Sequence, residues 1–209
     1  FQITAETLKT IAADPEHLGA QIGFFAVLHS WGQNLVFHPH LHCVVPGGGL
    51  SPDGKRWVAC KRKPDFFLPV RVLSRLFRRR FLESLQTAFD SGKLQFFGSL
   101  EPLREPSAFA RQIARAKSVE WVVYAKRPFA GPQQVLDYVG RYTHRVAISN
   151  NRLVDIEGGQ VHFQWKDYRD NSQVKTMSLS ADEFIRRFMI HGFPEGFQRI
   201  RYYGFLGNR

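Results

Sequence analysis

The sequence has few of the residues that build disulfide frameworks or thiolate metal sites. Among its 209 residues there are two cysteines, Cys43 and Cys60, and no Cys-x-x-Cys pair, so a cysteine-ligated zinc site within this chain is not expected. It contains no apolar run of about 18 residues that would predict a transmembrane helix, and no secretory signal pattern at its start. We therefore expect a cytoplasmic protein with no membrane partner.

Acidic residues are also scarce. Asp and Glu number 18 against 29 Lys and Arg, which gives a formal net charge of +11 and a pI of about 10.1. Such a balance is typical of proteins that bind a polyanion, above all nucleic acid. The alternative is a basic surface that only aids solubility. A basic membrane-surface helix is disfavoured, because the positive charge is spread over several segments.

The length and composition fit one domain with a small appendage. Hydrophobic residues make up 44% of the chain and include 19 Phe, enough for an aromatic core. The sequence begins with Phe1 rather than Met, so we expect it to belong to a longer protein. We expect residues 1–20 to form a helical lead-in and residues 21–209 to form the main domain.

Apolar periodicity predicts strands and helices that interleave along the chain. Strands are expected over residues 21–31, 35–45, 56–60, 119–125 and 174–179, with a hairpin over 152–168. Helices are expected over residues 4–13, 70–89, 107–117, 131–142 and 181–190. Several links between strands have hairpin length, which favours an α+β fold with a central, mainly antiparallel sheet and helices packed on its faces.

The predicted helices over residues 70–89 and 107–117 carry arginines mostly on their polar faces. Basic side chains placed in this way can follow a phosphate backbone. The candidate DNA contacts on these helices are Arg71, Arg75, Arg78, Arg79, Arg111 and Arg115.

Three histidines alternate along the predicted strand over residues 35–45. Successive side chains of a strand point to opposite faces, so His38, His40 and His42 share one face. The opposite face, which we expect to pack in the core, carries Phe37, Pro39, Leu41 and Cys43. Adjacent histidines of the row lie roughly 7 Å apart and can bind one divalent cation. The alternative is an exposed strand face that happens to be rich in histidine.

Two tyrosines occur one helical turn apart in the predicted helix over residues 131–142. Tyr138 and Tyr142 are four residues apart and so share a face. A phenol has a pKa of about 10, so a nucleophilic tyrosine needs positive charge or a base nearby. Arg141, His144 and Arg145 are suitable neighbours. The alternative is that both tyrosines are half-buried packing residues.

The two motifs together resemble the HUH endonuclease superfamily, in which a His-hydrophobic-His strand precedes a helix with Tyr-x-x-x-Tyr. The longer motifs around these residues are His-Pro-His-Leu-His-Cys-Val-Val-Pro-Gly-Gly-Gly over 38–49 and Tyr-Val-Gly-Arg-Tyr-Thr-His-Arg-Val-Ala-Ile-Ser-Asn over 138–150. They resemble the two-tyrosine rolling-circle transposases of the "insertion sequence ninety-one" family. The segment Ile-Arg-Tyr-Tyr-Gly-Phe over 200–205 resembles the closing segment of that family, so the resemblance covers residues 21–209.

The resemblance implies an activity and a set of site residues. His40 and His42 would hold a divalent cation, Mg²⁺ or Mn²⁺, and Tyr138 and Tyr142 would be the nucleophiles. Such an enzyme nicks single-stranded DNA at transposon ends and target, forms a 5′-phosphotyrosine and rejoins strands without ATP. Arg141 and Arg145 would contact DNA beside the tyrosines. The implied setting is a prokaryotic cytoplasm.

The resemblance leaves the third metal ligand open. His144, just beyond the tyrosine helix, is the first candidate and Gln33 is the second, whereas His38 would flank the site. Members of the family tend to carry a Cys-rich zinc-binding region upstream, which this chain lacks, so target-site recognition within it is expected to be incomplete.

Two other classes fit parts of the sequence. The run His38-Pro-His-Leu-His42 also resembles the signature of histidine-triad nucleotide hydrolases, which use a histidine nucleophile and no metal. The net charge of +11, the chain length and the paired tyrosines disfavour this reading. The other alternative is a DNA-binding module with a structural metal and no catalysis.

Overall fold

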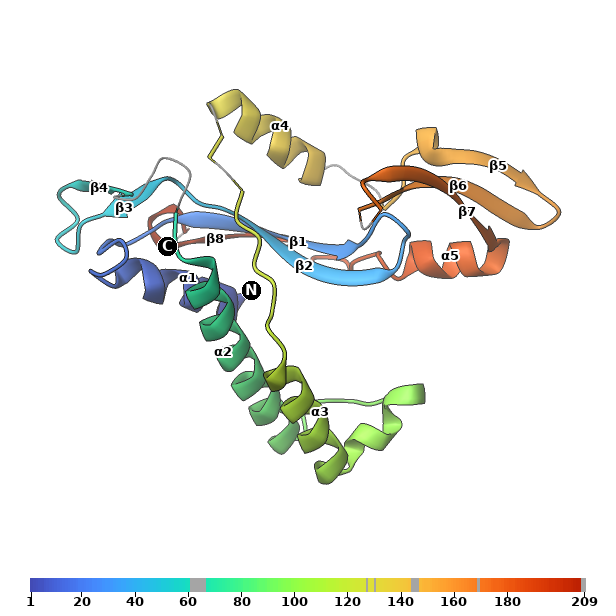
Figure 1. Cartoon of the computed structure of the whole chain (residues 1–209), viewed down its shortest axis with the longest axis horizontal. Coiled ribbons are helices and arrows are strands. Elements are labelled where there is room, and N and C mark those ends of the chain that lie inside the picture. Colours follow the sequence, from blue (N-terminus) through green and yellow to red (C-terminus); the bar gives the residue numbers. More distant parts are fainter. Residues whose placement is uncertain (61–66, 127, 130, 144–146, 169, 208–209) are drawn as a thin grey trace. The chain divides into compact units, whose positions relative to one another are not determined.

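The computed structural model describes residues 1–60, 67–126, 128–129, 131–143, 147–168 and 170–207, and only the backbone of residues 139 and 141–143. The helices are α1 Gln2–Ala13, α2 Val70–Asp90, α3 Pro106–Ser118, α4 Pro132–Thr143 and α5 Ala181–Met189, with short 3₁₀ turns η1 Gly98–Arg104, η2 Asn150–Arg152 and η3 Gly204–Leu206. The strands are β1 Phe24–Trp31, β2 Phe37–Val44, β3 Gly48–Leu50, β4 Trp57–Ala59, β5 Leu153–Glu157, β6 Gln160–Asp167, β7 Gln173–Ser180 and β8 Ile200–Tyr203. Antiparallel pairing and interleaved helices confirm the α+β class (Figure 1).

The chain divides into two compact units. The first comprises residues 1–24, 45–128 and 202–209, and the second comprises residues 25–44 and 129–201. None of the helices within the described ranges is long and apolar enough to cross a membrane.

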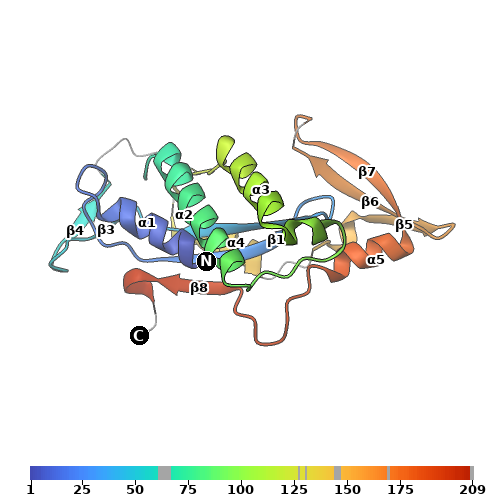
Figure 2. The ribbon, with the colours of Figure 1, turned by 90° about the horizontal axis from the view of Figure 1, so that it is seen from below.

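Helices dominate the first unit, in which α2 and α3 lie side by side (Figures 1 and 2). The α2–α3 contact is aromatic: the rings of Phe89 and Phe109 stack with centroids 4.0 Å apart. In its middle, α2 presents Phe77 and Phe81 to the ring of Trp121. The 21 residues of α2 confirm the helix predicted from its apolar spacing.

The second unit begins with the β1–β2 hairpin. Strand β1 lies between β2 and β8 in a three-stranded sheet, which makes β2 an edge strand among the described elements. The antiparallel register pairs His29 with His40 and Trp31 with Phe37, with an irregularity between the two pairs. Two residues of β2, His38 and Pro39, therefore oppose one residue of β1, which is a β-bulge. Proline has no N–H for the ladder, and bulges and edge strands are where it is tolerated.

The turn of this hairpin is anchored in the core of the second unit. Leu35 has a left-handed backbone with φ of 59°, which is unusual for a residue with a bulky side chain. Its side chain is fully buried in a cluster with Ala147, Ile148 and Phe163. Further apolar residues pack around that cluster, namely Trp31, Trp165, Met177, Leu179 and Phe184.

The rest of the second unit is a three-stranded antiparallel sheet in the order β5–β6–β7, with α5 beside it (Figure 1). The β5–β6 turn falls at Gly158 and Gly159, both with positive φ, as the sequence predicts. Helix α5 begins at Ser180, whose hydroxyl accepts a hydrogen bond from the backbone N–H of Glu183, a standard N-cap.

Two expectations about strands are wrong. Residues 119–125 form no strand, because side chains of α2 take up backbone carbonyls there: Ser74 donates to Trp121 and Arg78 donates to Val119. The face of β2 expected to pack in the core is also not uniformly buried. Phe37, on that face, is 57% exposed, because it lies at the start of an edge strand, directly after the turn. Leu35, in the turn, is the residue that packs into the core.

The Phe163 ring is the largest side chain of the second unit's core cluster and is 0% exposed. We expect Phe163→Ala to lower the free energy of unfolding by about 3–5 kcal/mol, because a cavity replaces the ring. Ile156→Ala, at a 71% exposed position of β5, serves as the control and should change it by less than about 0.5 kcal/mol. Urea denaturation measures both, and equal losses in the two variants would contradict this assignment of the core.

Candidate metal and nucleophile site

Three histidines of the β1–β2 hairpin converge on one point. One ring nitrogen from each of His29, His40 and His42 lies within 4.8 Å of the others. Their strands explain the grouping: His29 directly opposes His40 in the antiparallel pair, and His42 lies two residues along β2 on the same face. The cluster can hold a divalent cation on one side of the sheet.

His29 is the buried member of the cluster, at 4% exposure. Its ring stacks on Trp31 with centroids 5.0 Å apart and nearly parallel planes. The edges of the other two rings meet it, with centroid distances of 4.6 Å to His42 and 5.5 Å to His40. The contact with Trp31 fixes the orientation of the His29 ring, which the backbone position of His29 alone would not determine.

His40 is held in the form that binds a cation. Its Nδ1 lies 2.7 Å from the carbonyl oxygen of His38. Since a carbonyl only accepts, Nδ1 carries the proton and Nε2 offers its lone pair. Burial lowers the pKa of His40, which favours the neutral imidazole. His38 itself is exposed and lies outside the cluster.

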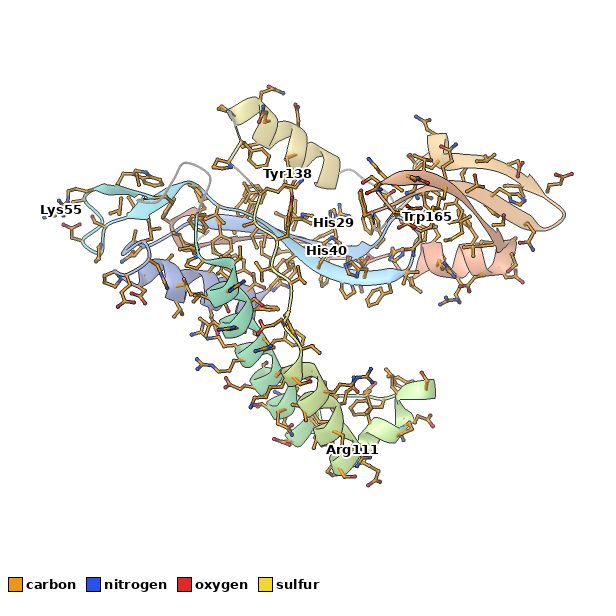
Figure 3. All side chains as sticks on the ribbon, in the orientation of Figure 1. His29, His40, Lys55, Arg111, Tyr138 and Trp165 are labelled. Carbon is orange, nitrogen blue, oxygen red and sulfur yellow. The ribbon has the colours of Figure 1, made fainter. Side chains whose placement is uncertain are left out.

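Tyr138 reaches this cluster from helix α4. Its hydroxyl lies 2.7 Å from Nδ1 of His42, and Figure 3 shows the side chain extending from α4 toward the strands that carry His29 and His40. The Tyr138 ring also contacts the ring of Phe129, at a centroid distance of 5.2 Å. With Nδ1 facing the phenol, Nε2 is the nitrogen that His42 can offer to a cation.

The other predicted site residues beside the tyrosine helix are less fully described. Tyr142 and Arg141 lie in α4, but their side chains fall outside the described atoms. His144 and Arg145 lie outside the described residues. Gln33 lies in the hairpin turn, where its amide donates to the Tyr168 hydroxyl at 3.5 Å. The ligand roles of His144 and Gln33 stay predictions.

Sequence reasoning missed His29. A single histidine in the apolar run over residues 21–31 reads as a core residue. The available signal was that the next strand carries a histidine row and that a short turn joins the two strands. A hairpin brings neighbouring strands into register, so a histidine on the first strand can face the row on the second.

The thiol next to the cluster is not a ligand candidate. Burial raises the pKa of Cys43 to about 12, which disfavours the thiolate that a metal would bind. It lies one residue from His42 in β2 and therefore on the opposite face of the strand.

The predicted DNA contacts of the first unit separate into two kinds. Those on α2 and α3 that are exposed to solvent are Arg71, Arg75, Arg79, Arg111 and Arg115. Arg78 differs, because its side chain is only 18% exposed and its guanidinium donates to the carbonyl of Val119. Arg78 thus holds the segment after α3 against α2.

A histidine cluster beside a helical tyrosine, in a basic α+β chain, is a candidate phosphodiester-processing site. Residues 23–209 match the family model Y2_Tnp, described as "Putative transposase". The chain belongs to this family of Y2 rolling-circle transposases. Membership disfavours the nucleotide-hydrolase alternative.

Curated relatives agree with this assignment. The chain is 73% identical over 209 residues to "Putative transposase y4qJ" of Sinorhizobium fredii, of which it covers 52%. It is 27% identical over 214 aligned positions to "Transposase for insertion sequence element IS801" of Pseudomonas savastanoi pv. phaseolicola, of which it covers 48%. The chain thus spans about half the length of these relatives. No solved structure matches it.

We expect His29→Ala to weaken Mn²⁺ binding at least roughly tenfold, or about 1.4 kcal/mol, because one of three converging nitrogens is lost. His40→Ala and His42→Ala should do the same. His38→Ala is the matched control, since it removes an imidazole of the same strand that lies outside the cluster. Isothermal titration calorimetry measures the affinities. An effect of His38→Ala as large as that of His29→Ala would contradict the assignment of ligands.

Proposed function

We propose that this chain carries the catalytic centre of a metal-dependent enzyme that nicks single-stranded DNA and transfers the strand through a 5′-phosphotyrosine. The observation that carries the proposal is the contact between the Tyr138 hydroxyl and His42, at 2.7 Å. It brings a possible nucleophile to the edge of a cluster that can hold a cation. Family membership supports transposition as the process that this chemistry serves.

The donor set of the cluster fits a divalent transition metal. Three imidazoles converge, and His40 and His42 each direct Nδ1 to another partner. Imidazole suits transition metals, whereas Mg²⁺ prefers oxygen ligands and water. Of the two expected cations we therefore propose Mn²⁺ over Mg²⁺. A cation bound there would polarise a non-bridging oxygen of the scissile phosphate and offset its developing charge.

The chain's own residues perform the bond exchange. The Tyr138 oxygen forms a bond to the phosphorus, and its proton passes to solvent. The bond from phosphorus to the 3′ oxygen breaks, and that oxygen takes up a proton from solvent and leaves as a 3′-hydroxyl. Nδ1 of His42 lies within hydrogen-bond distance of the attacking oxygen, so it can fix the direction of the phenol. One phosphoester replaces another, so rejoining needs no ATP.

Two tyrosines permit two 5′ ends of DNA to be bound covalently at the same time. Tyr142 lies one helical turn beyond Tyr138 in α4, about 6 Å along the axis. We propose that one tyrosine makes the first cut and the other accepts the second end while the first adduct persists. The alternative is that one tyrosine is the nucleophile and the other packs or positions DNA.

A denaturing gel tests the nucleophile assignment. A labelled pool of random-sequence single-stranded oligonucleotides and Mn²⁺ should give a denaturation-resistant adduct with the native chain. Tyr138→Phe and Tyr142→Phe should each retain some cleavage but lose strand transfer, and the double variant should form no adduct, because Phe has no nucleophilic oxygen. Tyr124→Phe is the control, at an 80% exposed position outside α4.

Mass spectrometry of the trapped peptides locates the phosphotyrosine. An adduct that maps to one tyrosine only, together with intact transfer when the other is Phe, would rule out two nucleophiles. DNA binding by the double variant is the companion measurement. An adduct in the double variant would place the covalent bond on another residue and overturn the tyrosine mechanism. DNA binding by the native chain without any adduct would leave a DNA-binding module with a structural metal.

The exposed arginines of α2 and α3 should bind the DNA backbone. We expect log affinity for single-stranded DNA to fall with log salt by about 0.7 per phosphate neutralised. Arg75→Gln and Arg79→Gln should each reduce that slope, because both side chains are mostly exposed. Arg78→Gln should leave the slope unchanged and lower stability instead. Fluorescence anisotropy over a salt series measures the slope, and equal affinity for blunt duplex would contradict single-strand preference.

A further inference from the structure

Side chains from later segments of the second unit are hydrogen-bonded to the turn between β1 and β2. Three successive carbonyls of this turn each accept a hydrogen bond from a different side chain: Gln33 from Arg152, Asn34 from Arg187 and Leu35 from His191. We call Arg152, Arg187 and His191 the loop clamp. These contacts add to the turn's own backbone hydrogen bonds, from Gly32 to Val36 and from Leu35 to Gly32.

Each arginine of the loop clamp is itself oriented by a second contact. Arg152 donates through Nε to the carbonyl of Gln164, at 2.8 Å, which ties it to β6. Arg187 reaches Asn34 at 3.3 Å, and its Nε pairs with Glu183 one turn back along α5, at 2.7 Å. The turn is thereby connected to both the β5–β6–β7 sheet and α5.

His191 connects the loop clamp to the metal cluster. It is 6% exposed, and its Nε2 donates to the Leu35 carbonyl at 3.0 Å. In the neutral ring Nδ1 then accepts from the Ser30 hydroxyl, at 3.2 Å. Its ring also meets Trp31, at a centroid distance of 5.8 Å, and Trp31 in turn stacks on His29.

The conformation held in this way decides which side chains face each other. Leu35 keeps a left-handed backbone, which is unfavourable for a residue other than glycine, and burial of its side chain together with the His191 bond offsets that cost. The turn sets the register of β1 against β2. A slip of one residue would send His29 to the other face of the sheet.

We propose that Arg152, Arg187 and His191 are positioning residues for the metal centre: they set the spacing of His29 against His40 and His42 without contacting the cation. The inference rests on the proposed function of the cluster. It predicts that the loop clamp determines cation affinity and coordination geometry, beyond its share in stability.

The chain offers a matched pair of arginines for the test. Arg186 and Arg187 both pair with Glu183, but only Arg187 is hydrogen-bonded to the turn. We expect Arg187→Met to weaken Mn²⁺ binding roughly 10- to 100-fold, as loss of a supporting residue behind metal ligands does, and to shift the visible absorption bands of bound Co²⁺. Arg186→Met should change neither. Arg187→Lys, which keeps one donor, should restore part of the affinity.

His191→Phe and His191→Gln provide the second test, because Phe keeps the ring but loses both hydrogen bonds, whereas Gln keeps a donor and an acceptor. Imidazole ¹H–¹⁵N spectra of the metal-free protein supply a readout that does not depend on the cation. We expect the His29 and His40 resonances to move in Arg187→Met and His191→Phe, and to stay in Arg186→Met.

The outcomes separate the inference from the proposed function. Absence of Mn²⁺ and Co²⁺ binding by the native chain would refute the metal centre, and the imidazole spectra would still decide whether the loop clamp positions the rings. Lower melting temperature in Arg187→Met and His191→Phe, with unchanged imidazole spectra and, where the native chain binds metal, unchanged affinity and Co²⁺ bands, would overturn the inference and leave these residues a purely structural role.

Discussion

The pairing of His29 with His40 across β1 and β2 is the contact on which the candidate site depends. It places a buried imidazole from one strand against two imidazoles of the next, and the Tyr138 hydroxyl meets this group through His42. The pairing is not determined by the strands alone. It follows from a turn whose carbonyls accept hydrogen bonds from side chains of η2, of α5 and of His191, two residues beyond α5, and from a bulge at Pro39 where β2 gains a residue over β1.

Much of the fold and part of the site were predictable because the relevant signals are local. Helix α2 follows from an apolar row at helical spacing, and the β5–β6 turn follows from two adjacent glycines. His40 and His42 could be assigned to one face because strand geometry requires it. Tyr138 could be placed on a helix, and the structure brings its hydroxyl to His42.

The remainder depends on contacts between distant segments, which periodicity does not report. His29 reads as a core residue until the register of two strands is known. Arg78 lies among arginines that the sequence predicts to contact DNA, yet its guanidinium donates a hydrogen bond to the carbonyl of Val119, 41 residues away. The carbonyls of residues 119 and 121 satisfy their hydrogen bonding with side chains of α2, so a segment with the composition of a strand forms none.

Pro39 has a consequence beyond the bulge that it occupies. Strand β2 is an edge among the described strands, and an exposed edge with an apolar residue such as Phe37 is a template on which other extended chains can assemble. A residue without an N–H interrupts the row of donors along that edge, and the bulge bends it away from a flat geometry. The same proline that helps to set the histidine register thus also disfavours self-association along the edge of a strand that carries three imidazoles.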